Sequence, residues 1–257
     1  MAFTMFDGLS RLIKHCRVPL RAPPRTGRPG TDGPIRSLSI GPWESTSEPA
    51  TRGPMTRYSI RTLGSTTWPD FVRIMEKHNG VWNGCWCLQF HLGPGERVPS
   101  VARRRRRKET LVRTHRSHAA LVYDASTLVG WCQFGPPTEL PGRMTAYAKL
   151  GVAPPDRRIT CFFVDRDRRK EGIAKAALEG ALRLIAADGG GTVDGYPIDT
   201  RGKPASGSFL WSGTDSMFAR LGFRPLVPLG TSKRVVRKRV RSRRKATRRP
   251  PLEIERP

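Results

Sequence analysis

Residues 169–174 have the types and the spacing of a loop that binds an anion. They read Arg-Lys-Glu-Gly-Ile-Ala, which fits the pattern Arg or Gln, two free positions, Gly, one free position, and Gly or Ala. Where such a loop opens a helix, the first backbone N–H groups have no partner within the helix, and the helix dipole attracts negative charge. Gly172 carries no side chain, so a diphosphate can approach its backbone closely. The short pattern also arises by chance, so the elements on either side of it decide whether it marks a binding loop.

Two elements must position this loop, a strand before it and a helix after it. Residues 159–164 read Ile-Thr-Cys-Phe-Phe-Val, a β-branched and aromatic run that is typical of a central strand. Residues 172–188 predict a helix that is apolar nearly all round, with charges recurring every fourth position from Lys175 to Arg183. Only that charged stripe need face water. The three glycines at 189–191 end the helix.

The remaining pattern predicts an alternation of strands and helices. The expected strands are residues 58–63, 119–123, 128–134, 192–196, 223–227 and 232–238, and the expected helices are 68–78, 102–117 and 212–221. The proline- and glycine-rich residues 136–155 are expected to form a long loop. The predicted order is β-α-α-β-β-β-α-β-α-β-β.

The formal net charge of +26 belongs mostly to two segments. Residues 233–257 hold twelve Lys or Arg against two Glu, and residues 101–116 hold eight against one Glu. These segments account for +17, so the rest of the chain carries only +9. Such charge could hold the protein near RNA or ribosomes. The run Arg103–Arg107 is nevertheless most often a solvated helix face.

The cysteines predict a reducing compartment rather than a disulfide framework, because the chain has only five, and the number is odd. Cys85 and Cys87 are the only close pair. A zinc site from them with Cys132, Cys161 or His91 is conceivable, but no second short-spaced pair supports it, so no metal is expected. No apolar run reaches the length of a membrane span, and the expected location is cytoplasmic.

The organised pattern begins just after Met55. Residues 1–55 are rich in Pro, Gly, Ser, Thr and Arg, and are expected to be a disordered arm, with Met55 as a possible true start. Residues 56–240 are expected to form one domain, and residues 241–257 a disordered basic tail.

The strand, the loop, the long helix and the order of the elements resemble the GNAT superfamily of N-acetyltransferases, whose signature loop holds the diphosphate of acetyl-CoA. The resemblance spans about residues 56–240. It implies an α/β fold in which helices flank a mixed, mostly antiparallel seven-stranded sheet. Residues 208–214, 215–220 and 221–223 also resemble the later helix of the superfamily and its Gly-Phe ending. The sequences of residues 85–87, 119–124, 130–135 and 195–197 resemble one bacterial group of the superfamily.

The resemblance also implies which residues bind acetyl-CoA. Backbone groups of the central strand would pair with the pantetheine arm, and N–H groups of the 169–174 loop would hold the diphosphate. A backbone N–H near Val164 would polarise the thioester carbonyl as it becomes an oxyanion. The expected binding residues are Phe162, Phe163, Val164, Arg169, Lys170, Glu171, Gly172, Ile173, Ala174 and Ser212.

The groups that transfer protons are less clear from the sequence. Some relatives have a basic Glu where this chain has Arg158, and many have an acidic Tyr where it has Phe218, so neither residue can act in that way. Tyr196 and Asp165 are expected near strand ends, where the reaction would occur. Tyr196 is the candidate proton donor, and transfer through water is the alternative.

The sequence thus predicts an acyltransferase that moves an acetyl group from acetyl-CoA to an amine by direct attack. The acceptor and the oligomeric state are not predicted. Two alternatives remain open: a basic nucleic-acid- or ribosome-associated protein that uses a GNAT-like scaffold, and a catalytically silent domain that binds CoA.

Overall fold

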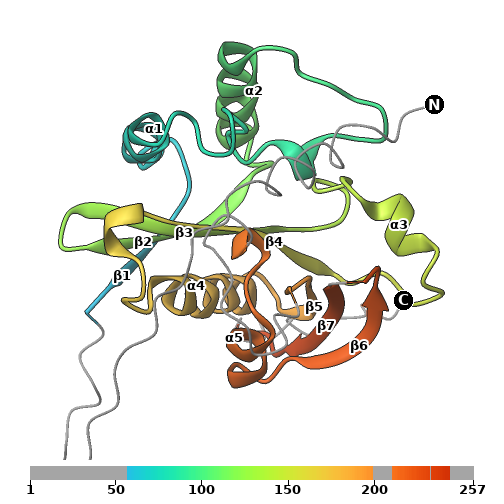
Figure 1. The fold of residues 1–257 in the computed structure, drawn as a ribbon. Helices are drawn as coiled ribbons and strands as arrows, with labels where there is room; N and C mark the ends of the chain where they lie inside the picture. The colour runs from blue at the N-terminus through green and yellow to red at the C-terminus, as the bar shows by residue number, and fades with distance from the viewer. Residues whose placement is uncertain (1–56, 199–209, 232, 244–257) are drawn as a thin grey trace, which may run out of the picture. The chain divides into compact units, whose positions relative to one another are not determined.

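The computed structural model describes residues 57–198, 210–231 and 233–243 (Figure 1). The described elements belong to one compact unit that runs from Arg52 onward. The predicted arm over residues 1–55 lies outside the described residues. So do residues 208 and 209 and all of the predicted tail after residue 243.

The described residues form seven strands, five α-helices and three short 3-10 turns. The strands are β1 (Ser59–Thr62), β2 (His118–Asp124), β3 (Thr127–Gly135), β4 (Arg157–Val164), β5 (Gly191–Gly195), β6 (Arg224–Leu229) and β7 (Lys233–Val240). The helices are α1 (Trp68–Lys77), α2 (Val101–Arg113), α3 (Met144–Ala148), α4 (Ile173–Ala187) and α5 (Asp215–Arg220), and the turns are η1 (Gln89–His91), η2 (Arg166–Arg168) and η3 (Leu210–Ser212).

The strands form one sheet in the order β1-β2-β3-β4-β5-β7-β6. Each neighbouring pair is antiparallel except β4 with β5. The expected α/β fold with a mixed, mostly antiparallel seven-stranded sheet is therefore confirmed.

The two parallel strands β4 and β5 meet over a very short length. Their register contains only Arg157 opposite Val193 and Arg158 opposite Asp194. From Ile159 onward, within the described residues, β4 keeps its partner β3 but has no paired residue on β5. The sheet therefore opens along most of β4, and Figure 1 shows β4 and β5 diverging.

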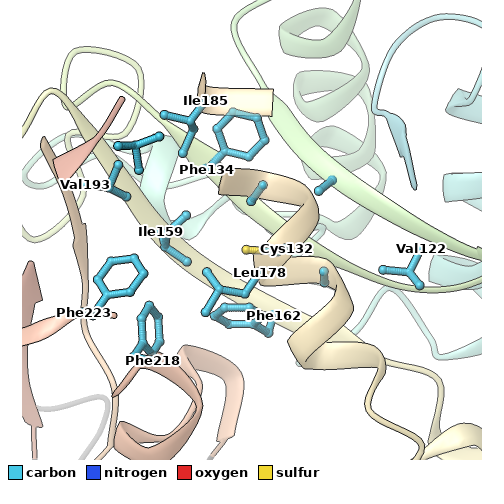
Figure 2. Packing of buried hydrophobic residues seen from close by; sticks show 14 of the residues in the cluster. Val122, Cys132, Phe134, Ile159, Phe162, Leu178, Ile185, Val193, Phe218 and Phe223 are labelled. Atoms are coloured by element: carbon cyan, nitrogen blue, oxygen red, sulfur yellow. The ribbon is translucent and has the colours of Figure 1, made fainter. Parts of the chain in front are cut away.

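Helices cover both faces of the sheet, and each face has its own apolar core. Figure 1 shows α4 on one face and α1 with α2 on the other. In the α4 core, Leu178 and Ile185 pack with sheet residues such as Ile159 and Phe162 (Figure 2). On the other face, Trp131 of β3 lies at the centre of the second core. Because a strand alternates its side chains between faces, adjacent residues of β4 enter different cores.

Two local expectations differ from the structure. The predicted loop 136–155 contains the short helix α3, whose N-cap residue Arg143 has a left-handed φ of 66°. The predicted helix 212–221 is divided into η3 and α5. The side chain of Thr214 caps α5 by accepting from the Met217 N–H, and the preceding Gly213 has a φ of 79° that interrupts a helix.

Gly130 lets β3, β4 and α4 approach closely. A Cβ at this position would lie 2.7 Å from the Phe163 carbonyl oxygen and 2.7 Å from Ile173 Cγ2. We expect Gly130→Ala to lower the free energy of unfolding by about 1–3 kcal/mol, since a backbone atom must shift to admit the methyl group. Urea unfolding of the full chain measures this.

The matched control is Gly64→Ala, where a Cβ would meet no atom within 4 Å. Equal stability of the two variants would contradict the packing described for Gly130.

Candidate functional site

The 169–174 loop reaches the beginning of α4 through two residues with left-handed backbone. Lys170 has a φ of 68° and Gly172 a φ of 80°. Within α4, the first N–H with a helical acceptor is that of Ala176, which donates to Gly172 O, so the N–H groups of residues 173–175 have no acceptor in the helix. A Cβ on Gly172 would meet nothing within 4 Å. The space beside these N–H groups is open, as an anion site requires.

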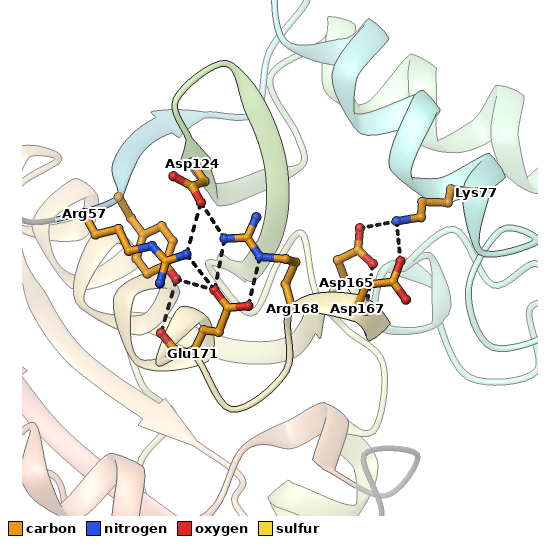
Figure 3. Close-up of polar contacts among 8 residues, drawn as sticks. Arg57, Lys77, Asp124, Asp165, Asp167, Arg168 and Glu171 are labelled. Carbon is orange, nitrogen blue, oxygen red and sulfur yellow. Dashed lines mark hydrogen bonds and ion pairs between the residues drawn. The ribbon is translucent and has the colours of Figure 1, made fainter.

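Glu171 does not place its negative charge in that open space. Arg168 Nε and Nη2 donate to its two carboxylate oxygens at 2.9 and 3.0 Å, and Arg57 lies 3.0 Å away (Figure 3). Hydrogen bonding from Arg168 holds the pKa of Glu171 below its usual value. Arg168 also pairs with Asp124 at the end of β2. This cluster of charges balances the carboxylate, and the N–H groups at the start of α4 remain as the anion-binding feature.

The aromatic residues expected along the cofactor strand use their side chains for packing. Phe162 contacts Phe218 edge to face in the α4 core, with ring centroids 6.0 Å apart. Phe163 stacks on Trp131 in the other core at 4.5 Å. Val164 is half-buried. The rings of Phe162 and Phe163 are therefore committed to packing, and the backbone role expected for these residues stays a prediction.

Thr160 marks an irregularity of β4 that the sequence pattern did not predict. Gln133 lies opposite Cys161 and Phe134 opposite Ile159, so Thr160 is an extra residue without a partner on β3. A bulge of this kind frees the backbone of one residue from the ladder. The Thr160 hydroxyl is also buried and has no hydrogen-bond partner. No residue type in the sequence signals this position, since it follows from the strand register.

Ser212, an expected cofactor contact, lies in η3, which packs against β4. The residue is buried, and its hydroxyl has no hydrogen-bond partner. A buried polar group without a partner costs free energy unless a ligand or water satisfies it. Thr160 on β4 and Ser212 on the adjoining η3 are thus two buried hydroxyl groups without a hydrogen-bond partner.

Tyr196, the candidate proton donor, is buried immediately after β5. Its hydroxyl accepts a hydrogen bond from Arg158 Nε at 2.8 Å, which leaves its own proton free for an acceptor. Burial raises the pKa of Tyr196, while the Arg158 guanidinium acts in the opposite direction. Arg158 is itself buried, and Nη1 donates to the carbonyls of Leu140 and Gly142. A tyrosinate formed here would be stabilised by a fixed positive charge.

Asp165, the other residue considered for proton transfer, has a structural position. Its carboxylate pairs with Lys77 at 2.8 Å and lies 3.2 Å from His78 Nε2. It also accepts from the Asp167 N–H. Burial alone would raise the pKa of Asp165, but the hydrogen bond from Lys77 and the other interactions hold it below its usual value. The carboxylate links α1 to the turn after β4.

Cys87 and Cys161 contribute to the core on the face that α1 and α2 cover, whereas Cys132 lies in the α4 core. Cys87 Sγ lies 3.6 Å from Cys161 Sγ. Among the described residues, no group of three or more His, Cys, Asp or Glu side chains has the geometry to hold a metal ion. No helix in the described ranges is long and apolar enough to cross a membrane.

Both ring nitrogens of His91 have hydrogen-bond partners. Its Nδ1 bonds the Glu139 carbonyl at 2.9 Å, so Nδ1 carries the proton and Nε2 accepts. Near Nε2 lie Gln133 Nε2 at 2.9 Å, Ser117 Oγ at 3.2 Å and Lys108 Nζ at 3.3 Å. Burial and the charge of Lys108 lower the pKa of His91 to about 2. The imidazole is thus a neutral structural acceptor.

Acidification should therefore destabilise the protein through His91. In the unfolded chain this histidine gains a proton below about pH 6.5, whereas the folded chain does not bind it there, so stability falls as the pH decreases. Between pH 6 and pH 5, we expect wild-type stability to fall more steeply than that of His91→Gln, by about 1.4 kcal/mol per pH unit. Urea unfolding at each pH measures the slopes.

The two slopes should coincide between pH 7.5 and 8.5, where histidine is neutral in both states. Parallel slopes at pH 5–6 as well would show that His91 is protonated in the fold.

A comparison with protein families matches the central part of the chain. Residues 82–193, which contain β2 to β4, the 169–174 loop and α4, match the acetyltransferase (GNAT) family. No curated protein matched the chain.

Several solved structures match at low identity. An acetyltransferase from Thermus thermophilus is 17% identical, with 71% of this chain and 96% of that chain covered and a TM-score of 0.40. A histone acetyltransferase HPA2 and related acetyltransferase structure from Corynebacterium glutamicum is 13% identical, with 74% and 98% covered and a TM-score of 0.44. A ribosomal-protein-S5-alanine acetyltransferase from Vibrio fischeri is 11% identical, with 72% and 94% covered and a TM-score of 0.43.

The family match covers the segment that holds the signature loop, the strand before it and the helix after it, and these elements have the expected arrangement. Residues 82–193 therefore belong to a GNAT acetyltransferase domain, which supports an acyltransferase enzyme.

Proposed function

We propose that this enzyme transfers an acetyl group from acetyl-CoA to an amine, in the opening between β4 and β5. The observation that carries the proposal is the open start of α4, where three N–H groups lack helical acceptors and Gly172 leaves space beside them. A diphosphate is the matching ligand, since it satisfies several N–H groups and interacts favourably with the helix dipole.

The residues that bind acetyl-CoA divide into two groups. The backbone of Phe162, Phe163 and Val164 borders the opening and would pair with the pantetheine arm, while Ser212 offers a hydroxyl from η3. The diphosphate would lie at residues 169–174, where Arg169 and Lys170 add exposed positive charge. A backbone N–H near Val164 would polarise the thioester carbonyl, and the bulge at Thr160 adds a backbone position outside the β3–β4 ladder.

The bonds change in one direct step. The nitrogen of a neutral amine attacks the acetyl carbon, so that a C–N bond forms and the C–S bond breaks. The nitrogen loses a proton to water, and the departing thiolate gains one. We assign this second proton to Tyr196, because Arg158 would stabilise the tyrosinate that remains and water can then restore its proton.

A nucleic-acid role receives less support from the basic run in α2. Arg104 donates to the carbonyls of Val98 and Asn83, and Arg105 pairs with Glu76. Arg107 pairs with Glu96. These arginines therefore have partners within the domain, and surface pairs of this kind are individually weak. Acyl transfer, by contrast, explains the open start of α4 and the part of β4 that has no partner on β5.

Gly172→Ala tests the phosphate site. The alanine must adopt a φ that costs about 1 kcal/mol, and its methyl group occupies the space beside the N–H groups. We expect the Kd for acetyl-CoA, measured by isothermal titration, to rise by about tenfold or more, equivalent to losing about 1.4 kcal/mol.

The matched control is Gly189→Ala at the other end of α4, which also has a positive φ and open space. It should lose similar stability and keep wild-type affinity for acetyl-CoA. Equal affinities of the two variants for acetyl-CoA would show that the diphosphate does not bind at the start of α4.

Tyr196→Phe tests the proton donor. The variant retains the ring that packs with Tyr147 and loses only the hydroxyl. We expect kcat for acetyl transfer to fall by about 10²-fold, the lower end for loss of general acid catalysis, while the Kd for CoA stays within twofold. Unchanged turnover would favour proton transfer through water. Binding of CoA without turnover of any amine by the wild-type chain would instead indicate a silent CoA-binding domain.

A further inference from the structure

Two cations from different elements face one aromatic ring near the start of β4. Lys233, the first residue of β7, places Nζ 3.7 Å from the centroid of the Trp211 ring. Arg143, at the start of α3, places Cζ 5.8 Å from the same centroid. Phe90 contacts that ring from a third element, with centroids 5.8 Å apart. We call Arg143, Lys233 and Trp211 the cation cluster.

The cation cluster adjoins the proposed reaction centre. Arg143 follows Gly142, whose carbonyl accepts from Arg158, and Arg158 in turn holds the Tyr196 hydroxyl. Trp211 precedes Ser212, whose hydroxyl is buried without a partner. The cluster therefore joins the side chains that surround the first residues of β4.

The diphosphate site lies at the other end of the same strand. The 169–174 loop follows Val164, whereas Arg158 and its partners are at the beginning of β4. The six residue steps between these positions span about 20 Å at the usual rise of a strand. The cluster is thus on the side from which an acceptor approaches, and the cofactor diphosphate does not neutralise it.

Among the described residues, no carboxylate balances the charge of the cluster. Within the described ranges, the ion pairs join neither Arg143 nor Lys233 to a carboxylate. Burial and the nearby Arg143 lower the pKa of Lys233 to about 8, with an opposing effect from Cys161 of β4. Arg143 also has a φ of 66°, a strained value for a residue with a side chain. An anion between the two cations would relieve their repulsion.

We propose that the acceptor is a small amine with an anionic group, a carboxylate or a phosphate, that binds between Arg143 and Lys233 beside Trp211. This inference rests on the proposed acetyl transfer and adds the chemical class of the acceptor. Both cations donate charge-assisted hydrogen bonds to oxygen, and the Trp211 ring holds the lysine in place. The amine of the same molecule can then extend toward Arg158 and Tyr196.

The experiment compares four amines of similar size on the full chain saturated with CoA. β-Alanine and phosphoethanolamine carry a carboxylate and a phosphate, while ethanolamine is uncharged apart from its amine and 1,2-diaminoethane has a second amine. Isothermal titration should show binding of at least one anionic amine about tenfold tighter than ethanolamine, the usual gain from one charge-assisted hydrogen bond. The carboxylate and phosphate arms identify which anion the site prefers.

Two variants assign that preference to the cluster. Arg143→Gln and Lys233→Gln should each weaken binding of the preferred anionic amine by about tenfold or more, with little change for ethanolamine. Arg183→Gln, an exposed arginine of α4, is the control and should match the wild type. The Kd for CoA, measured separately, should be the same in all three variants.

Equal binding of the four amines to the wild type, or unchanged anion affinity in both cluster variants, would overturn the assignment. These outcomes are separate from failure of the proposed function. Weak CoA binding, or the absence of acetyl transfer to any amine, would count against acetyl transfer even where the anionic amines bind through the cluster.

Discussion

The separation of β4 from β5 is the constraint on which the site depends. A strand in the middle of a sheet normally forms hydrogen bonds on both sides, but β4 pairs with β5 only at Arg157 and Arg158. The next residues enter two apolar cores, so the strand cannot move into solvent to satisfy its backbone. In the proposed function, the amide groups of the pantetheine arm of acetyl-CoA would supply the missing partners.

Interactions at both ends of β4 keep the opening in place. At its carboxyl end, Asp165 holds Lys77 and His78, while Arg168 joins Glu171 to Asp124. At its amino end, Arg158 connects the carbonyls before α3 to the hydroxyl of Tyr196. Charged side chains thus hold both ends of β4 in place, while β-sheet hydrogen bonds do not join most of β4 to β5. A buried guanidinium without this set of acceptors would be costly.

The distribution of positive charge gives different roles to residues of one type. Arg104 and Arg105 of the conspicuous arginine run have contacts within the domain. Arg143 and Lys233, which stand far apart in the sequence, instead share one aromatic ring, although Lys233 begins the basic segment 233–257. The position of a cation relative to acceptors and rings, rather than the local density of Lys and Arg, decides whether it is available to a ligand.

The sequence by itself determined the order of the elements and the place of the signature loop. Local pattern was sufficient there, because the apolar runs of β2 and β3, the apolar helix α4 and the left-handed Gly172 each depend on neighbours within a few residues. It also suggested Tyr196 and Ser212, although their roles remain proposals. Met144–Ala148 escaped detection, since five residues among prolines and glycines carry too weak a helical period.

Only the tertiary structure decided which distant residues meet. The bulge at Thr160 depends on the register between β3 and β4, and the contact of Arg158 with Tyr196 depends on where β4 and β5 part. The cation cluster joins residues 143, 211 and 233 through three separate elements. Such contacts arise from packing across long sequence separations, and no local spacing encodes them.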